Sequence, residues 1–467
     1  MKANDGTMKY RIEKDTLGEV KIPSEKLWGA QTERSRKNFK IGPEGSMPLE
    51  IIYAYSIIKK CAAKTNNYLG VLSNEKSDLI CKVCDEISSG LHDEHFPLVI
   101  WQTGSGTQTN MNINEVISNR IQQLIGKKLD EERFVNSNDD VNKSQSSNDT
   151  FPTAMNIAAY QTVKHKTIPA LKILLKNLQK KSNEFKNIIK IGRTHMMDAT
   201  PITLGQEFSA FAKQIEKGIN SIENSIKLFS EIALGGTAVG TGLNTPKGYA
   251  KKVAELISKE TGFPITSSTN KFEALSSHDS FIDAHSSLKR IAISLNKISN
   301  DLRLLSSGPR AGFSEIILPA NEPGSSIMPG KINPTQCEAV SMVSSKVMGN
   351  DTTISFSAAQ GHLQLNVFKP VIIESFLNSA KLLADSVESF TNNCISGIKP
   401  NLKSIENKLK SSLMLVTALN TKIGYYKSAE IANNAFNNNT TLKEEAIKSG
   451  YLTSEEYEKF VDPKKMV

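Results

Sequence analysis

The feature that most constrains the fold of this sequence is a pair of long apolar repeats without proline. Apolar side chains recur every three or four residues from 208 to 229, and they alternate between steps of three and four from 281 to 305. This spacing predicts amphipathic helices, the second carrying a stripe sustained for about three heptads. Helices this long are not stable alone in water, so the stripes must be buried on neighbouring helices. The stripe residues are Phe208, Phe211, Ile215, Ile219, Ile222, Ile226, Phe229, Phe281, Ala284, Leu288, Ile291, Leu295, Ile298, Leu302 and Leu305.

Shorter repeats at 49–61, 335–350 and 371–390 predict further helices, so the fold class is mainly α with a long central helix bundle. The chain has 467 residues, too many for one compact core. We expect an N-terminal domain over residues 1–145, a central helical bundle domain over 146–400 and a small C-terminal helical domain over 401–467.

Composition narrows the class of protein. The net charge is +9, but the lysines are spread along the helices and form no basic patch with aromatic residues, so nucleic acid is not an expected partner. No window is apolar for about eighteen residues, so no membrane span is expected, and residues 1–15 lack the apolar run of a secretory signal. Five scattered cysteines are typical of reduced thiols in a cytoplasm.

Three patterns that suggest a metal or cofactor have simpler explanations. Cys81 and Cys84 lie in a helical run with no second pair, and His92 and His95 have no third ligand nearby. The glycine-rich stretch 235–244 follows no strand and lacks the spacing of a dinucleotide fingerprint, so it is expected to connect helices. The sequence therefore predicts no cofactor and no metal site.

Two polar stretches, 103–112 and 135–149, combine short hydroxyl and amide side chains. Such loops can surround a carboxylate without carrying net charge, although turns stabilised by serine and threonine have the same composition. His195 lies in a non-helical insertion of the bundle, 192–201. Histidine is suited to proton transfer near neutral pH, but a lone histidine is often structural.

The most specific stretch is 324–333, which has two glycines, adjacent serines, one proline, and a lysine followed two residues later by asparagine. It predicts a mobile loop that brings Ser325, Lys331 and Asn333 to one small anion. Lysine would supply a compact positive charge and asparagine a hydrogen-bond donor.

Residues 324–333, 103–112, 146–149 and 192–201 resemble the shared regions of the fumarase/aspartase superfamily, and the resemblance covers nearly the whole chain. Members of this superfamily are homotetrameric helical lyases that release fumarate by anti-elimination. The resemblance implies a fumarase/aspartase-like three-domain fold whose central bundle forms the tetramer core. It also implies active sites shared between three subunits.

The resemblance assigns residue roles. Ser325 would be the catalytic base, His195 its acid/base partner, and Glu338 would order the catalytic machinery. A secondary anion site would use Asn136, Ser137, Asn138 and Asp139. The expected substrate-binding residues are Ser105, Gly106, Thr107, Ser146, Ser147, Asn148, Thr194, Ser326, Lys331, Ile332 and Asn333.

Residues 321–323, 335–338 and 146–147 resemble the fumarase branch. They imply an iron-independent hydro-lyase of the citric acid cycle that interconverts fumarate and (S)-malate. An aspartate ammonia-lyase of the same fold and a non-enzymatic helical scaffold are the alternatives. The sequence departs from the family at Asn136 and Ser137, where histidine and proline are usual, which weakens the secondary site. Met197 replaces the usual glutamine.

Overall fold

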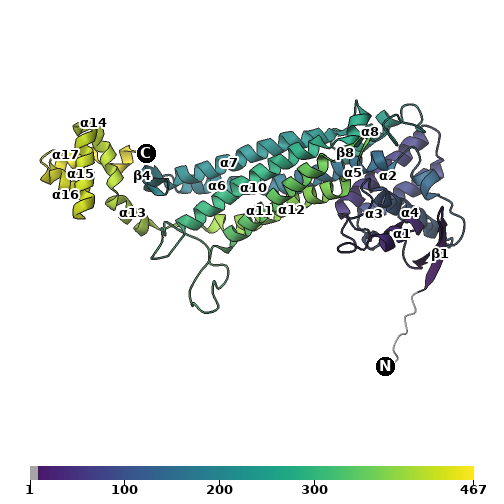
Figure 1. Cartoon of the computed structure of the whole chain (residues 1–467), viewed down its shortest axis with the longest axis horizontal. Helices are drawn as coiled ribbons and strands as arrows, with labels where there is room; N and C mark the ends of the chain where they lie inside the picture. The colour runs from purple at the N-terminus through teal and green to yellow at the C-terminus, as the bar shows by residue number, and fades with distance from the viewer. Residues whose placement is uncertain (1–8) are drawn as a thin grey trace, which may run out of the picture. The chain divides into compact units, whose positions relative to one another are not determined.

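The computed structural model describes residues 9–467, and helices dominate it (Figure 1). The strands within these residues form two-stranded sheets only, so the predicted mainly α fold class is confirmed. No helix among the described residues has the length and hydropathy needed to cross a membrane.

Contacts divide the chain into two compact units. Unit 1 comprises residues up to Ile168, Asn220–Lys289 and Lys346–Leu382, and unit 2 comprises Pro169–Ile219, Arg290–Ser345 and Leu383–Val467. The division of the chain into domains at 145/146 and 400/401 stays a prediction.

Unit 1 begins with an antiparallel hairpin and a group of helices, which Figure 1 draws in purple and blue. Helix α2 packs against α3, α5 and α8 through a face of buried aliphatic residues. The elements are β1 (Tyr10–Asp15), β2 (Gly18–Pro23), α1 (Ala30–Asn38), α2 (Leu49–Tyr68), α3 (Asn74–Ser88), α4 (Thr107–Leu124), α5 (Ser147–Thr162), β5 (Glu231–Ile232), α8 (Tyr249–Thr261), β6 (Thr266–Ser267), α9 (Lys271–Ser276), β8 (Gly361–His362) and β9 (Leu365–Asn366).

Unit 2 contains a second hairpin and a C-terminal group of helices. Figure 1 draws the C-terminal helices in yellow. The C-terminal helices enclose a small core of their own, which includes Leu419, Ile431 and Ala446. The elements are β3 (Ile189–Thr194), β4 (Met197–Thr203), β7 (Ile316–Ile317), β10 (Lys399–Pro400), α13 (Leu402–Ser411), α14 (Asn420–Ile423), α15 (Tyr425–Asn438), α16 (Leu442–Lys448) and α17 (Ser454–Phe460).

The long helices contribute residues to both units. They are α6 (Ile168–Glu184), α7 (Leu204–Ser225), α10 (Asp279–Leu305), α11 (Thr335–Ala358) and α12 (Lys369–Asn393). Every residue of the two predicted stripes is buried, so both predicted repeats are confirmed. The first repeat ends differently, because residues Ile226–Ser230 tighten into a 3-10 turn after α7.

Aromatic side chains form the centre of the bundle within each unit. In unit 1 the ring of Phe376 from α12 lies 5.4 Å from Phe281 of α10 and 5.7 Å from Phe229. In unit 2 the Phe208 ring lies 5.3 Å from Phe185 and 5.5 Å from Phe211. Each buried phenylalanine contributes about 1.5–3 kcal/mol to the stability of the fold.

Candidate active site

Residues 324–333, the predicted mobile loop, lie between β7 and α11 in unit 2 and are called the signature loop below. The backbone of this loop holds Ser325 in place. The Oγ of Ser325 accepts hydrogen bonds from the backbone N–H groups of Ile327, at 3.2 Å, and Met328, at 3.0 Å. Both donors would stabilise negative charge on this oxygen, because hydrogen bonds to the charged form of a group favour that form. The geometry therefore suits a serine that acts as an alkoxide.

Lys331 and Asn333 lie together at the end of this loop. The Nζ of Lys331 donates to Oδ1 of Asn333 at 2.8 Å, and Nδ2 of Asn333 donates to the carbonyl of Gly324 at 2.6 Å. The N–H of Gly324 donates to the carbonyl of Lys331 at 2.9 Å. A Cβ at position 324 would lie 2.4 Å from that carbonyl oxygen, so the closure requires glycine.

A cavity of about 870 Å³ in unit 2 is lined by Lys331, Ile332, Asn333 and Glu338. This volume lies within the range of small-molecule sites. Glu338 is in the first turn of α11, where its backbone N–H donates to the carbonyl of Pro334. The loop side chains are accessible: Ile332 is 49% exposed, and Ser326 is also exposed.

His195 lies at the tip of the β3–β4 hairpin, in a turn that the sequence did not predict. The hairpin closes at the pair Thr194 and Met197, and the two turn residues His195 and Met196 have φ values of 55° and 65°. Positive φ at both central residues defines a type I′ turn, which is costly for these residue types. Such strain is typical of functional sites. Among the described residues, no hydrogen bond joins the His195 side chain to Ser325 or Lys331.

A buried ion cluster in unit 2 anchors this hairpin. Nη2 of Arg193 lies 2.5 Å from Oε1 of Glu315, and Nζ of Lys190 lies 3.0 Å from Oε2. Lys190 also pairs with Glu207 at 3.0 Å. Burial alone would raise the pKa of Glu315, but the hydrogen bond from Arg193 and the charge of Lys190 hold it below its usual value.

Replacing Glu315 by glutamine is expected to lower the free energy of unfolding by about 3 kcal/mol at pH 7, because the partly buried Arg193 loses its carboxylate and the buried Lys190 loses one of two. The folded pKa of Glu315 is depressed, so its contribution is present above the unfolded pKa and is lost as pH falls through the folded value. Urea unfolding at pH 7 and under acid conditions measures both effects.

The matched control is Glu207→Gln, since Glu207 is more exposed and its ion pair within residues 9–467 is with Lys190. Its cost is expected to be about 1 kcal/mol or less. Equal stability of wild type and Glu315→Gln at pH 7 would show that the cluster does not anchor the hairpin.

The hydroxyl residues of the two polar stretches come together in unit 1. Oγ1 of Thr107 lies 2.8 Å from Oγ of Ser105 and 2.7 Å from Oγ of Ser147. Thr107 and Ser147 are the first residues of α4 and α5, so two helix N-termini meet at one hydroxyl cluster. Free backbone N–H groups at such ends favour an anion.

Glycine and an N-cap determine how these two helices begin. Gly106 has φ 77°, and a Cβ there would lie 2.0 Å from the Phe151 ring. Ser146 caps α5 in a capping box with Asp149.

The predicted glycine-rich connection, 235–244, is a loop in the structure. Asp149 Oδ2 accepts from the N–H groups of Gly235 at 3.0 Å and Thr237 at 2.8 Å.

The same loop fixes Asn148, whose Nδ2 donates to the carbonyl of Ala238 at 2.8 Å. Burial raises the pKa of Asp149 to about 6, although three backbone hydrogen bonds oppose this shift. The glycine-rich loop therefore supports the start of α5 and the candidate residues 146–148.

The predicted secondary anion site forms a five-residue π turn, Ser137–Val141. The Oδ1 of Asn136 accepts from the backbone N–H groups of Asn138, at 2.8 Å, and Asp139, at 3.0 Å. These donors already have a partner in the chain. An anion would bind them only after Asn136 turned away, and the secondary site stays a prediction.

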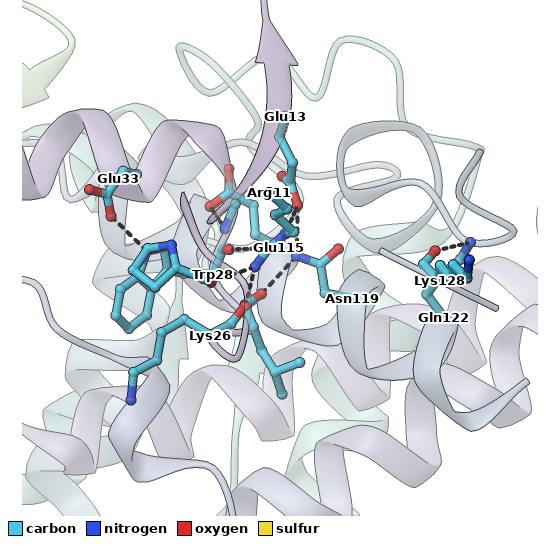
Figure 2. Close-up of polar contacts among 12 residues, drawn as sticks. Arg11, Glu13, Lys26, Trp28, Glu33, Glu115, Asn119, Gln122 and Lys128 are labelled. Atoms are coloured by element: carbon cyan, nitrogen blue, oxygen red, sulfur yellow. Dashed lines mark hydrogen bonds and ion pairs between the residues drawn. The ribbon is translucent and has the colours of Figure 1, made fainter. Parts of the chain in front are cut away.

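A buried anchor that the sequence did not reveal attaches the N-terminal segment to α4 (Figure 2). The carboxylate of Glu115 accepts from the N–H groups of Gly29 and Gln31, both at 2.8 Å, and from the Thr32 hydroxyl at 2.6 Å. Burial raises the pKa of Glu115 to about 7 against these hydrogen bonds. The available signal was a carboxylate next to the apolar pair Val116 and Ile117 in a predominantly uncharged stretch.

Arg11 completes this anchor. Its guanidinium donates to the carbonyls of Pro23, Lys26 and Trp28, at 2.9, 2.6 and 2.6 Å. The Trp28 indole donates to Glu33 at 2.9 Å, and Figure 2 draws this hydrogen bond as a dashed line from the indole ring to Glu33. Residues 26–35 therefore have a structural role, because they lie against the middle of α4, where Glu115 is located.

The histidine pair in the sequence is also accounted for by contacts within unit 1. The Nε2 of His92 lies 2.8 Å from Oε2 of Glu86, and the Nδ1 of His95 accepts from the N–H of Leu27 at 3.3 Å. The described cysteines are free thiols, and Cys84 is fully buried.

Comparisons with known proteins agree along nearly the whole chain. Residues 18–349 match a family described as lyase, and residues 415–467 match the fumarase C C-terminus. The chain is 61% identical to the class II fumarate hydratase of Pasteurella multocida, covering 98% of this chain and 99% of that protein. It is 54% identical to the class II fumarate hydratase of Halalkalibacterium halodurans, with the same coverage.

Solved structures give the same result for the fold. The crystal structure of class II fumarase from Schistosoma mansoni has a TM-score of 0.96 at 44% identity. A fumarate lyase:delta crystallin from Brucella melitensis, bound to cobalt, has a TM-score of 0.93 at 40% identity. Each alignment covers 98% of this chain and 99% of the solved chain.

Proposed function

This chain belongs to the class II fumarate hydratases of the lyase family, and from that membership we propose that it interconverts (S)-malate with fumarate and water. The observation that carries the proposal is the signature loop, in which two amides hold the Ser325 oxygen while Lys331 and Asn333 lie together at the loop's end.

The difficult step is removal of a proton from the carbon next to a carboxylate, because the resulting carbanion places a second negative charge on that carboxylate. Ser325 takes this proton as the base. Lys331, Asn333 and backbone N–H groups stabilise the doubly charged species, since donors fixed in advance need no reorganisation. His195 gives a proton to the departing hydroxyl group, and Glu338 orders the loop.

Substrate binding uses the hydroxyl cluster and its neighbours. The helix N-termini at Thr107 and Ser147 supply donors to a carboxylate without a surface cation. The proposed substrate-binding residues are Ser105, Gly106, Thr107, Ser146, Ser147, Asn148, Thr194, Ser326, Lys331, Ile332 and Asn333. This set of residues needs no bound metal ion, so chelators are expected to leave the rate of the reaction unchanged.

The active enzyme is a homotetramer whose central helices form a common core and whose active sites take residues from three subunits. Large apolar side chains left exposed on α10 and α11 support this assembly, since an interface between subunits would bury them. Ile293, Leu304, Met342 and Phe356 are 50%, 40%, 68% and 65% exposed. The enzyme acts in the citric acid cycle and is located in the cytoplasm. The free thiols support the cytoplasmic location.

The test follows the ultraviolet absorbance of fumarate's conjugated double bond with malate or aspartate in separate cuvettes, with and without a chelator. The proposal predicts a rise with malate alone, unchanged by the chelator. A rise with aspartate alone would identify an ammonia-lyase of the same fold. No rise with either substrate would favour a scaffold without this chemistry.

A further inference from the structure

Lys59 on α2 is a fully buried lysine without a carboxylate partner. Its Nζ donates to three amide oxygens: Oδ1 of Asn110 at 2.7 Å, Oε1 of Gln145 at 3.0 Å and Oδ1 of Asn142 at 3.1 Å. Within residues 9–467, its ammonium group forms no ion pair. Burying a cation against neutral groups alone is costly, so this arrangement needs a functional reason.

The ammonium group lies one layer beneath the hydroxyl cluster. Asn110 follows Thr107 by three residues in α4, and Thr150 follows Ser147 by three residues in α5. Residues three apart share a helix face, and one turn rises about 5.4 Å. Asn110 and Thr150 are joined by a hydrogen bond of 3.2 Å. The layer that Lys59 contacts therefore lies one helical turn below Thr107 and Ser147, and Thr150 joins it to Ser146 through a hydrogen bond of 2.9 Å to the Ser146 carbonyl.

Lys59 also fixes the approach to Ser146. Nδ2 of Asn142 donates to the carbonyl of Gln145 at 3.2 Å, and Nε2 of Gln145 donates to the carbonyl of Lys143 at 2.9 Å. The amide side chains of Asn142 and Gln145 both accept from Lys59. One ammonium group thus ties α2, α4 and the 142–145 segment together.

The charges around Lys59 leave its own charge incompletely balanced. Asp149 on α5 is the carboxylate that acts on it, but the Asp149 oxygens accept from the N–H groups of Ser146, Gly235 and Thr237. Cys84 on α3 is buried, which raises the pKa of its thiol and keeps it neutral. The Tyr55 ring lies 5.7 Å from the ammonium group. Burial lowers the pKa of Lys59 to about 7, against the charge of Asp149.

We propose that Lys59 is a positioning residue for dicarboxylate binding, which holds the amide layer under the hydroxyl cluster and supplies a buried positive charge behind it. A substrate carboxylate at Thr107 and Ser147 is its mobile counter-ion. This inference rests on the proposed function, which places a carboxylate at that cluster.

Proton binding to Lys59 and dicarboxylate binding are linked, so the direction in which affinity changes with pH follows. In the free enzyme Lys59 loses its proton as pH rises through about 7. A bound carboxylate favours the charged form, so binding raises the pKa of Lys59 and takes up a proton above neutral pH. Reciprocally, dicarboxylate affinity falls as pH rises through this range.

The test compares KM and kcat for fumarate in wild type and Lys59→Met, a side chain of similar length without charge. At pH 6.5 the variant KM is expected to rise about tenfold, within the usual range of coupling between two sites. Above pH 8 the two KM values converge, and kcat changes less than about threefold. Lys64→Met, at an exposed position on α2, is the control and keeps the wild-type profile.

A structural role alone would lower kcat or the folded fraction and leave the KM ratio independent of pH, which would overturn the inference. If Lys59→Met does not fold, calorimetry of succinate binding to wild type decides the matter, in two buffers of different ionisation enthalpy at pH 8. Proton uptake supports the inference and its absence contradicts it. Failure of the proposed function is distinguished from failure of this inference, because in the former case the wild-type enzyme itself would show no turnover of fumarate.

Discussion

Replacing Ser325 by alanine is expected to lower the turnover of malate and fumarate by roughly 10³-fold or more, within the range for a positioned proton-transfer group. The variant loses the oxygen that two backbone amides hold at 3.2 and 3.0 Å. It keeps the loop closed, because the Gly324 and Asn333 hydrogen bonds do not involve the serine side chain. The measurement is kcat from the absorbance of fumarate.

Ser411→Ala is the matched control, since it removes an exposed hydroxyl at the end of α13. It is expected to keep wild-type kcat. Both variants should keep the circular dichroism spectrum and sedimentation coefficient of wild type. Unchanged turnover in Ser325→Ala would remove the assignment of this serine as the base.

Replacing His195 by asparagine is expected to lower kcat by about 10²-fold, because the departing hydroxyl group loses its proton donor. Asparagine is chosen because His195 has φ 55° and asparagine tolerates this conformation better than most residues. The type I′ turn therefore survives while the imidazole is removed. The measurement is the pH profile of kcat in both directions of the reaction.

Met196→Asn is the control for this variant, because it introduces the same residue at the second turn position, where φ is 65°. It is expected to keep wild-type kcat. If His195→Asn kept both the kcat and the pH profile of wild type, His195 would not be the proton donor to the departing hydroxyl group.

The sequence predicted the bundle well because burial of a helix stripe leaves a periodic signal. Every residue of the 208–229 and 281–305 repeats is buried. Helix α10, at Asp279–Leu305, begins two residues before the predicted stripe and ends with it. Composition indicated that the stretches 103–112 and 135–149 could surround a carboxylate, but it did not predict that Thr107 and Ser147, 40 residues apart, would meet.

The missed features are those that depend on single residues from distant segments. The β3–β4 hairpin has no alternating pattern and its turn residues, His195 and Met196, are not turn formers. Glu115, Glu315 and Lys59 are charged residues whose burial depends on partners far along the chain. Periodicity carries no information on such partners, because each network joins residues from segments that are far apart in the sequence.

We propose that the hydroxyl cluster of unit 1 and the signature loop of unit 2 act together at one active site assembled from several subunits. Subunit mixing tests this assembly: Ser325→Ala and Thr107→Ala are unfolded together, refolded as a mixture and assayed with malate. Each variant alone is expected to be nearly inactive. If the two groups come from different subunits, about one site in four in a random mixture regains both. Recovery of activity in the mixture is the expected result, and activity that stays at the level of the separate variants would rule out a site shared between subunits.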